Sequence, residues 1–149
     1  MAKTIVDIQS AIKTKIETLK DESDVSIFGE VSDYANADFS KYPAVVIKPT
    51  GGSGNRIDTH RIERTFSFEV TLYQEQSKAG TNKKTASEKM ASVSDQIIQA
   101  FDQDPSLSGA LEQVNVVGYD FDFTVRPGMF NFAIFKLECL VIVENYSTA

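Results

Sequence analysis

The residues that could do chemistry in this sequence are few and lie far apart. His60 is the only histidine and Cys139 the only cysteine among 149 residues. A zinc site needs several thiolate or imidazole ligands at short spacings, and a nucleophilic triad needs a base beside its nucleophile. Neither pattern surrounds these two residues. We therefore expect His60 to be a solvated loop residue and Cys139 to behave as a small, buried apolar residue.

Asp120 and Asp122 come closest to an acid–base pair. Because they lie two residues apart in an alternating segment, a strand would project both from one face, about 7 Å from each other. Tyr119 and Phe121 alternate with them, which is the pattern of any half-exposed strand. This pattern favours solvated or interface-facing aspartates over catalytic ones. We predict that the chain is not an enzyme, and we assign no catalytic residue, cofactor site or metal ligand.

The glycine-rich stretch TGGSGNRIDTH, residues 50–60, is similar to a phosphate-binding loop only in its glycines. A loop of that kind leads through Lys and Ser or Thr into a helix, whereas Arg56 here precedes isoleucine and aspartate. We instead predict a flexible arm at about 50–60 and a second polar arm at about 74–84. Long loops in a compact domain usually have a function.

Basic residues in the two arms can meet acidic surfaces of a neighbouring subunit, since the whole chain carries a net charge of −6. We expect this role for Arg56 and Arg61 near the first arm and for Lys83 and Lys84 in the second. The alternative for both arms is plain disorder. The acidic balance also argues against a sequence-independent grip on nucleic acid, which needs a basic face.

The length and composition indicate one soluble domain. Apolar residues make up 42% and charged residues 24%, and a chain of this length can bury a core without disulfides. The N-terminal segment is apolar only at every third or fourth residue, unlike a signal peptide or a membrane span. We expect a reducing, cytosolic environment and no membrane contact.

Two helices and at least four strands are expected from the spacing of apolar residues. Residues 4–21 and a segment from Thr85 to Asp104 have helical periodicity, and Thr4 with Asp7 forms a capping-box pattern. The strand-like segments are 43–49, 64–73, 114–125 and roughly 131–144, with a hairpin turn at 126–129. The fold class is therefore α+β: one domain over residues 1–149, with a single mostly antiparallel sheet of four or five strands and two helices packed on one face.

The last strand is apolar on both of its faces. Its second face carries four large apolar residues, namely Phe132, Ile134, Leu140 and Ile142. Two short helices can cover only one side of the sheet, so another surface must cover the second side. An identical subunit is the simplest candidate, and we assign these four residues to that interface.

The order of elements and four stretches of sequence resemble the tail terminator, or tail completion, proteins of tailed bacteriophages. The stretches are YPAVVIKP, RTFSFEVTLYQ, SDQIIQAFDQDPSLSGAL and AIFKLECLVIVENY. They are patterns of apolar and turn residues, and the resemblance in the order of elements spans nearly all of the chain. Proteins of this family have a sheet with helices on one side, and they form a six-membered ring on the end of the tail tube.

The resemblance implies a structural virion protein at the tail–neck junction, assembled in the cytoplasm of the bacterial host. The ring would end growth of the tail tube and offer a surface to neck or connector proteins, while DNA passes through without specific binding. In such a ring we expect Asp120 and Asp122 to line the channel and to repel DNA weakly.

Two alternatives stay open. A neck or head completion protein on the portal side has a related organisation, and the sequence pattern does not separate it from a tail terminator. A small-ligand-binding domain or an enzyme, with a pocket between helices and sheet, is disfavoured because the chain lacks a catalytic pattern.

Overall fold

The computed structural model describes residues 4–20, 23–33, 43–75, 83–122 and 130–144. They form two helices and five strands in the order α1 (Ile5–Glu17), β1 (Glu30–Ser32), β2 (Ala44–Arg56), β3 (Arg61–Glu75), α2 (Lys83–Gln103), β4 (Gln113–Asp122) and β5 (Phe130–Glu144). The strands make one sheet in the order β1-β2-β3-β5-β4. Every neighbouring pair is antiparallel except β1 with β2. This arrangement confirms the predicted α+β fold class.

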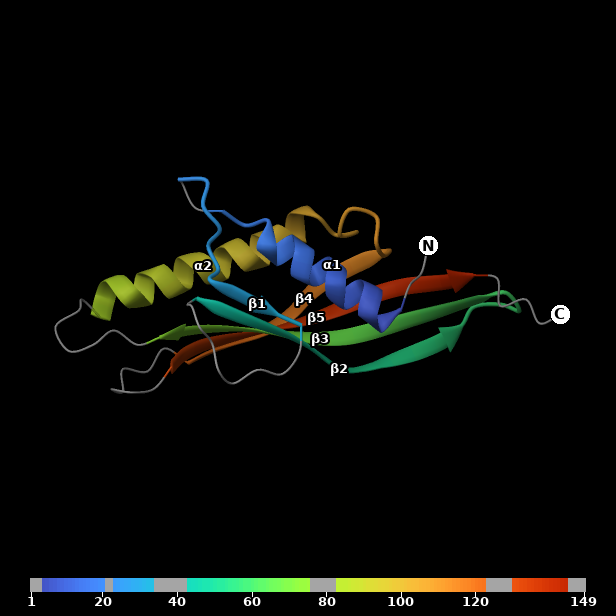
Figure 1. The fold of residues 1–149 in the computed structure, drawn as a ribbon. Coiled ribbons are helices and arrows are strands. Elements are labelled where there is room, and N and C mark those ends of the chain that lie inside the picture. The colour runs from blue at the N-terminus through green and yellow to red at the C-terminus, as the bar shows by residue number, and fades with distance from the viewer. Residues whose placement is uncertain (1–3, 21–22, 34–42, 76–82, 123–129, 145–149) are drawn as a thin grey trace.

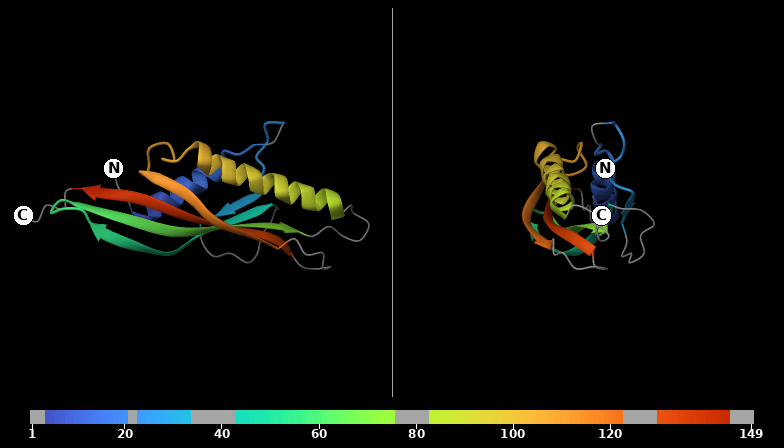
Figure 2. Two further views of the ribbon diagram at one scale, coloured as in Figure 1. Left: turned by 180° about the vertical axis from the view of Figure 1, so that it is seen from behind. Right: turned by 90° about the vertical axis from the view of Figure 1, so that its left-hand side faces the viewer.

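Both helices lie on the same face of a long, twisted sheet (Figures 1 and 2). The stripe Ile8, Ile12 and Ile16 of α1 is fully buried against this face, as its spacing predicted. The capping box is present, because Asp7 N donates to Thr4 Oγ1 at 3.2 Å and Thr4 N donates to Asp7 Oδ2 at 3.3 Å. These bonds satisfy amide groups that have no partner inside a helix.

The second helix packs beside β4 and ends close to α1. Met90, Ile97 and Phe101 project from its buried side. The carboxylate of Asp104 accepts from Ser108 N at 3.0 Å just after the helix ends. It also lies 3.3 Å from Lys15 Nζ, so an ion pair joins the end of α2 to α1.

The core consists of the helix stripes and the sheet face below them. The sheet contributes large, fully buried side chains from its three central strands, among them Ile47, Phe68, Leu72, Phe135 and Leu137. Direct pairing fixes these neighbours, since Phe68 lies opposite Leu137 and Leu72 lies opposite Ala133. A one-residue slip would turn every one of these side chains to the other face.

The prediction that residues 50–60 form an irregular, flexible arm is wrong. Residues 50–56 continue β2 and pair with β3 as far as Arg56 opposite Ile62, with one register shift between Pro49 and Gly51. Glycine weakens a strand, but a full ladder with the alternating residues of β3 offsets that weakness. Only Ile57–His60 lie outside the strands, and they form the turn of a long hairpin.

The second predicted arm is also shorter than expected. Gln74 and Glu75 belong to β3, and Lys83 and Lys84 open α2, which therefore begins two residues before the predicted start at Thr85. Residues 76–82 between them, and the predicted turn at 126–129, lie outside the described residues. The short parallel strand β1 has no sequence signal of its own, because three residues are too few to show alternation.

Candidate assembly surfaces

The face of the sheet opposite the helices is called the open face. Alternate residues of the strands form it. The register places there Ala44, Val46, Lys48, Gly51, Ser53 and Asn55 on β2; Glu63, Thr65, Ser67, Glu69, Thr71 and Tyr73 on β3; Phe132, Ile134, Lys136, Glu138, Leu140 and Ile142 on β5; and Gln113, Asn115, Gly118, Asp120 and Asp122 on β4. Ala44 and Val46 are buried. The described helices do not cover the open face (Figure 2).

The four apolar residues predicted for an interface all lie on the open face and are half-buried. They form two separate pairs. Phe132 and Ile134 lie beside Tyr73 and Thr71 at one end, and Leu140 and Ile142 lie beside Thr65 and Glu63 at the other. The protomer therefore shields these side chains only in part.

A charged band separates the two apolar pairs. Lys136 Nζ lies 3.5 Å from Asp120 Oδ2, and Lys48 Nζ lies 3.8 Å from Glu69 Oε2. The side chains of Lys136 and Asp120 are more than half exposed, so solvent screens the attraction between them. The open face thus offers two small apolar patches rather than one continuous apolar surface.

Asp120 and Asp122 lie on the open face, as their alternation predicted. Asp120 is exposed and Asp122 is half-buried. They are neighbours of Ile134 and Phe132 across the β4–β5 ladder. The structure therefore brings the predicted channel residues next to one of the two predicted apolar patches.

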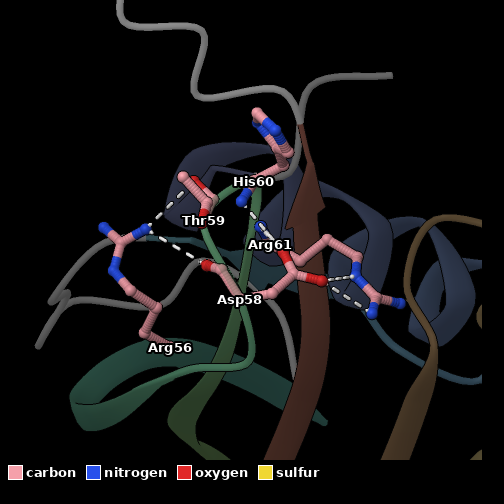
Figure 3. Close-up of polar contacts among 5 residues, drawn as sticks. All are labelled: Arg56, Asp58, Thr59, His60 and Arg61. Carbon is pink, nitrogen blue, oxygen red and sulfur yellow. Dashed lines mark hydrogen bonds and ion pairs between the residues drawn. The ribbon is translucent and has the colours of Figure 1, made fainter.

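The tip of the β2–β3 hairpin is held by side chains around Asp58 (Figure 3). Asp58 Oδ1 accepts from the backbone N–H groups of His60 and Arg61, both at 2.9 Å. Its Oδ2 accepts from Arg61 Nε at 2.8 Å. Arg56 Nη1 donates to the carbonyls of Asp58 and Thr59, both at 3.4 Å. The tip is thus an ordered turn that carries two arginines.

Hydrogen bonds to the charged carboxylate lower the pKa of Asp58, with the His60 amide as the largest cause and Arg61 next. The carboxylate therefore stays ionised to a lower pH than an ordinary aspartate, and its hydrogen bonds hold the turn in that form. His60 itself is exposed and contributes only its backbone amide to this network. The predicted role as a solvated loop residue agrees with this position.

Cys139 is fully buried on the helix side of β5. Burial raises the pKa of its thiol to about 12, since a thiolate would lose its hydration there. The thiol is thus a packing residue, as expected, and not a nucleophile at neutral pH.

The predicted interface residues do not form a single site. Arg56 and Arg61 lie at the hairpin tip, whereas Lys83 and Lys84 begin α2 near the opposite end of the molecule (Figure 1). The apolar pairs lie between these ends on the open face. Contacts through all of them would need neighbours on several sides of the protomer, as in a ring or a stacked assembly.

The outermost strand carries large apolar residues whose exposure the sequence pattern did not predict. Val117, Tyr119 and Phe121 are 53%, 52% and 47% exposed. Tyr119 and Phe121 point to the helix side, because they pair with the core residues Phe135 and Ala133. The alternation was visible in the sequence, but alternation does not tell which strand lies at an edge.

The family models and the curated proteins compared with this chain give no match. Among the described helices, none is long and apolar enough to span a membrane. In the same residues, His, Cys, Asp and Glu side chains do not gather in groups of three or more that could hold a metal ion.

Proposed function

We propose that the chain is a structural protein of a tailed bacteriophage, a tail terminator that forms a six-membered ring on the end of the tail tube. The ring stops growth of the tube and offers its other surface to the neck or connector proteins of the head. This assignment rests on the sequence resemblance stated above, and the α+β fold agrees with what that resemblance implies.

The observation that supports assembly most strongly is the unequal covering of β5. Its helix side is closed by the chain's own helices, while the four apolar residues of the open face are half-buried. Complete burial of such a side chain contributes about 1.5–3 kcal/mol. Covering the remaining area of all four therefore stabilises a contact by at most several kcal/mol, which suits an assembly that forms cooperatively on a template.

DNA passes through the ring in this proposal without a specific contact. Asp120 and Asp122 face the channel and repel phosphates weakly, while Lys136 beside Asp120 limits that repulsion. The protein acts at the tail–neck junction of the virion after assembly in the bacterial cytoplasm.

The direct test is to assemble tail tubes from the tube protein of the same phage, with and without this chain, and to image them by electron microscopy with a label on the chain. We expect label at one end of each tube and a narrow distribution of tube lengths. Label on the portal side of heads, with tubes left bare, would overturn the assignment and favour a neck protein.

A further inference from the structure

The open-face row of β5 has the same order of residue types in both directions, apart from the sign of its two charges. From one end to the other the row consists of Phe132, Ile134, Lys136, Glu138, Leu140 and Ile142. The two central residues are exposed and the four apolar ones are half-buried. Each half of the row thus has two apolar residues outside and one charge inside, and the two charges are opposite. Such a row is complementary to a copy of itself turned end to end.

We propose that two copies of this chain pair open face to open face about a two-fold axis, with their β5 strands antiparallel and crossing at the level of Leu137. Lys136 of each copy then lies over Glu138 of the other. Ile134 lies over Leu140 in the same way, so apolar side chains meet apolar side chains on both sides of the charges. The contact is isologous, because each copy uses the same surface.

Charge selects this orientation and this register. If the two β5 strands ran parallel about a two-fold axis, Lys136 would face Lys136 and Glu138 would face Glu138. An antiparallel contact centred on Lys136 would also bring two lysines together, and it would place Ile134 over Glu138. Like charges at a contact, or a charge covered by an apolar side chain, disfavour these arrangements.

The strands on both sides of β5 fit the same axis. The acidic residues of β3 and β4 within the four central rows of the open face are Glu69 and Asp120. From their levels in the register, the axis places Glu69 over Ser67 of the other copy and Asp120 over Gln113. The central rows of β3 and β4 therefore do not oppose acidic side chains of the two copies.

Sheet geometry shows how far the complementarity extends. Sheets that pack face to face lie about 10 Å apart and cross at about 30°. Ile134 is three residues, or about 10 Å, from the crossing point, so the angle displaces it from Leu140 of the other copy by about 5 Å, one strand spacing. Phe132 and Ile142 lie farther out, where they contact neighbouring strands instead of each other. The four central residues of β5 thus carry the specificity.

The contact is small, which makes it reversible. β3 and β5 each place six residues on the open face, and β4 places five. At about 32 Å² of sheet for each residue, the two copies together cover roughly 1,100 Å², near the lower limit for specific interfaces. Copies joined in this way associate in concentrated solution and separate again on dilution.

The pairing goes beyond the proposed function, because it concerns the free chain and does not need a tail tube. The helix side stays uncovered in the pair, including a groove of about 430 Å³ whose lining includes Ile5, Pro49 and Ile62. The proposed ring uses the same apolar residues of the open face. If that function holds, a pair must therefore separate before its copies join a ring.

The test exchanges the two central charges in full-length chains. Lys136→Glu alone opposes acidic residues across the axis, and Glu138→Lys alone opposes lysines. We expect each variant to self-associate about tenfold more weakly than the parent, or less, in sedimentation velocity at low salt. An equimolar mixture of the two should restore dimers to within about threefold of the parent, since every central contact then joins opposite charges.

A chain with both exchanges gives a second measurement that does not depend on either single variant. Lys136→Glu with Glu138→Lys should pair with itself as the parent does, because opposite charges again meet across the axis. It should not pair with the parent, since both central contacts would then join like charges. A fluorescent label on one of the two chains distinguishes mixed pairs from pairs of identical copies.

Lys20→Glu is the matched control. The Lys20 side chain is 51% exposed, with Nζ 3.7 Å from Asp24 Oδ1, and the Lys136 side chain is 53% exposed, with Nζ 3.5 Å from Asp120 Oδ2. Lys20 follows α1 on the helix side, so the same change of charge falls away from the axis. We expect this variant to associate like the parent.

Three results would overturn the pairing: a parent that stays monomeric up to about 1 mM, single variants that associate like the parent, or a mixture no stronger than its components. The proposed function is judged separately. A chain that pairs as described but ignores tube ends keeps the pairing and loses the function. A chain that caps tubes without ever pairing keeps the function and loses the pairing.

Discussion

The two faces of β5 have almost the same apolar character but very different surroundings. On the helix side, Phe135, Leu137, Cys139 and Val141 are all 0–1% exposed. On the open face, the four apolar residues are half-buried and a charged band divides them. The difference teaches that a strand with two apolar faces can serve two purposes, since one face holds the protomer together and the other remains for contacts outside it.

The largest expected effect comes from placing a charge on the helix side of this strand. Leu137→Asp removes a fully buried leucine and leaves a carboxylate without water. The combined cost exceeds about 4 kcal/mol, a large share of the roughly 5–15 kcal/mol that stabilises a domain. We expect that urea unfolding, monitored by circular dichroism, no longer shows a cooperative transition. A folded variant with a normal transition would contradict the helix-side packing.

The same substitution three residues later should separate folding from assembly. Leu140→Asp alters a half-buried residue of the open face, so the free energy of unfolding should fall by only about 1 kcal/mol. We expect a folded chain whose self-association, or binding to tube ends, weakens by more than about tenfold. Light scattering coupled to size-exclusion chromatography measures this. Assembly like that of the parent would remove the open face from the interface.

A thiol probe can compare the two faces directly. Because burial raises the pKa of Cys139 to about 12 from 9.0, its thiolate population at pH 8 should fall roughly a thousandfold. We expect Cys139 to resist Ellman's reagent until the chain is unfolded, while a Leu140→Cys variant reacts quickly at its added thiol. Rapid labelling of the parent under native conditions would show that the helix side opens more readily than its packing implies.

The smallest effect is expected in the charged band. Lys136→Ala breaks the ion pair with Asp120, and Lys48→Ala breaks the one with Glu69. Each should change the free energy of unfolding by less than about 1 kcal/mol, and the change should shrink further in high salt. Urea unfolding at two salt concentrations tests this. A cost above about 2 kcal/mol for either variant would mean that the band is not solvated.

Local features of the fold were predictable from particular residues. The steps of three and four in Ile8, Ile12 and Ile16 predicted α1, and Thr4 with Asp7 predicted its start. The alternation of Phe68, Val70 and Leu72 predicted β3 and its buried face. These signals are reliable because the periods of helix and strand are properties of the backbone itself.

Features that depend on distant partners were not predictable. The glycines before Arg56 are typical of a loop, yet pairing with β3 makes them a strand. Tyr119 and Phe121 were expected on one face of a strand, but only the strand order shows that this strand is at the edge. The sequence also did not show that a charged band divides the predicted interface residues, since the charges come from β2, β3, β4 and β5 together.

The sequence by itself determined the type of each main element, the two apolar faces of the last strand and the shortage of groups that could do chemistry. The tertiary structure decided which of those faces the helices cover, where the sheet ends and where a groove remains. The physical reason is that periodicity is set by neighbouring residues along the chain, whereas burial and strand order depend on contacts between residues far apart in it.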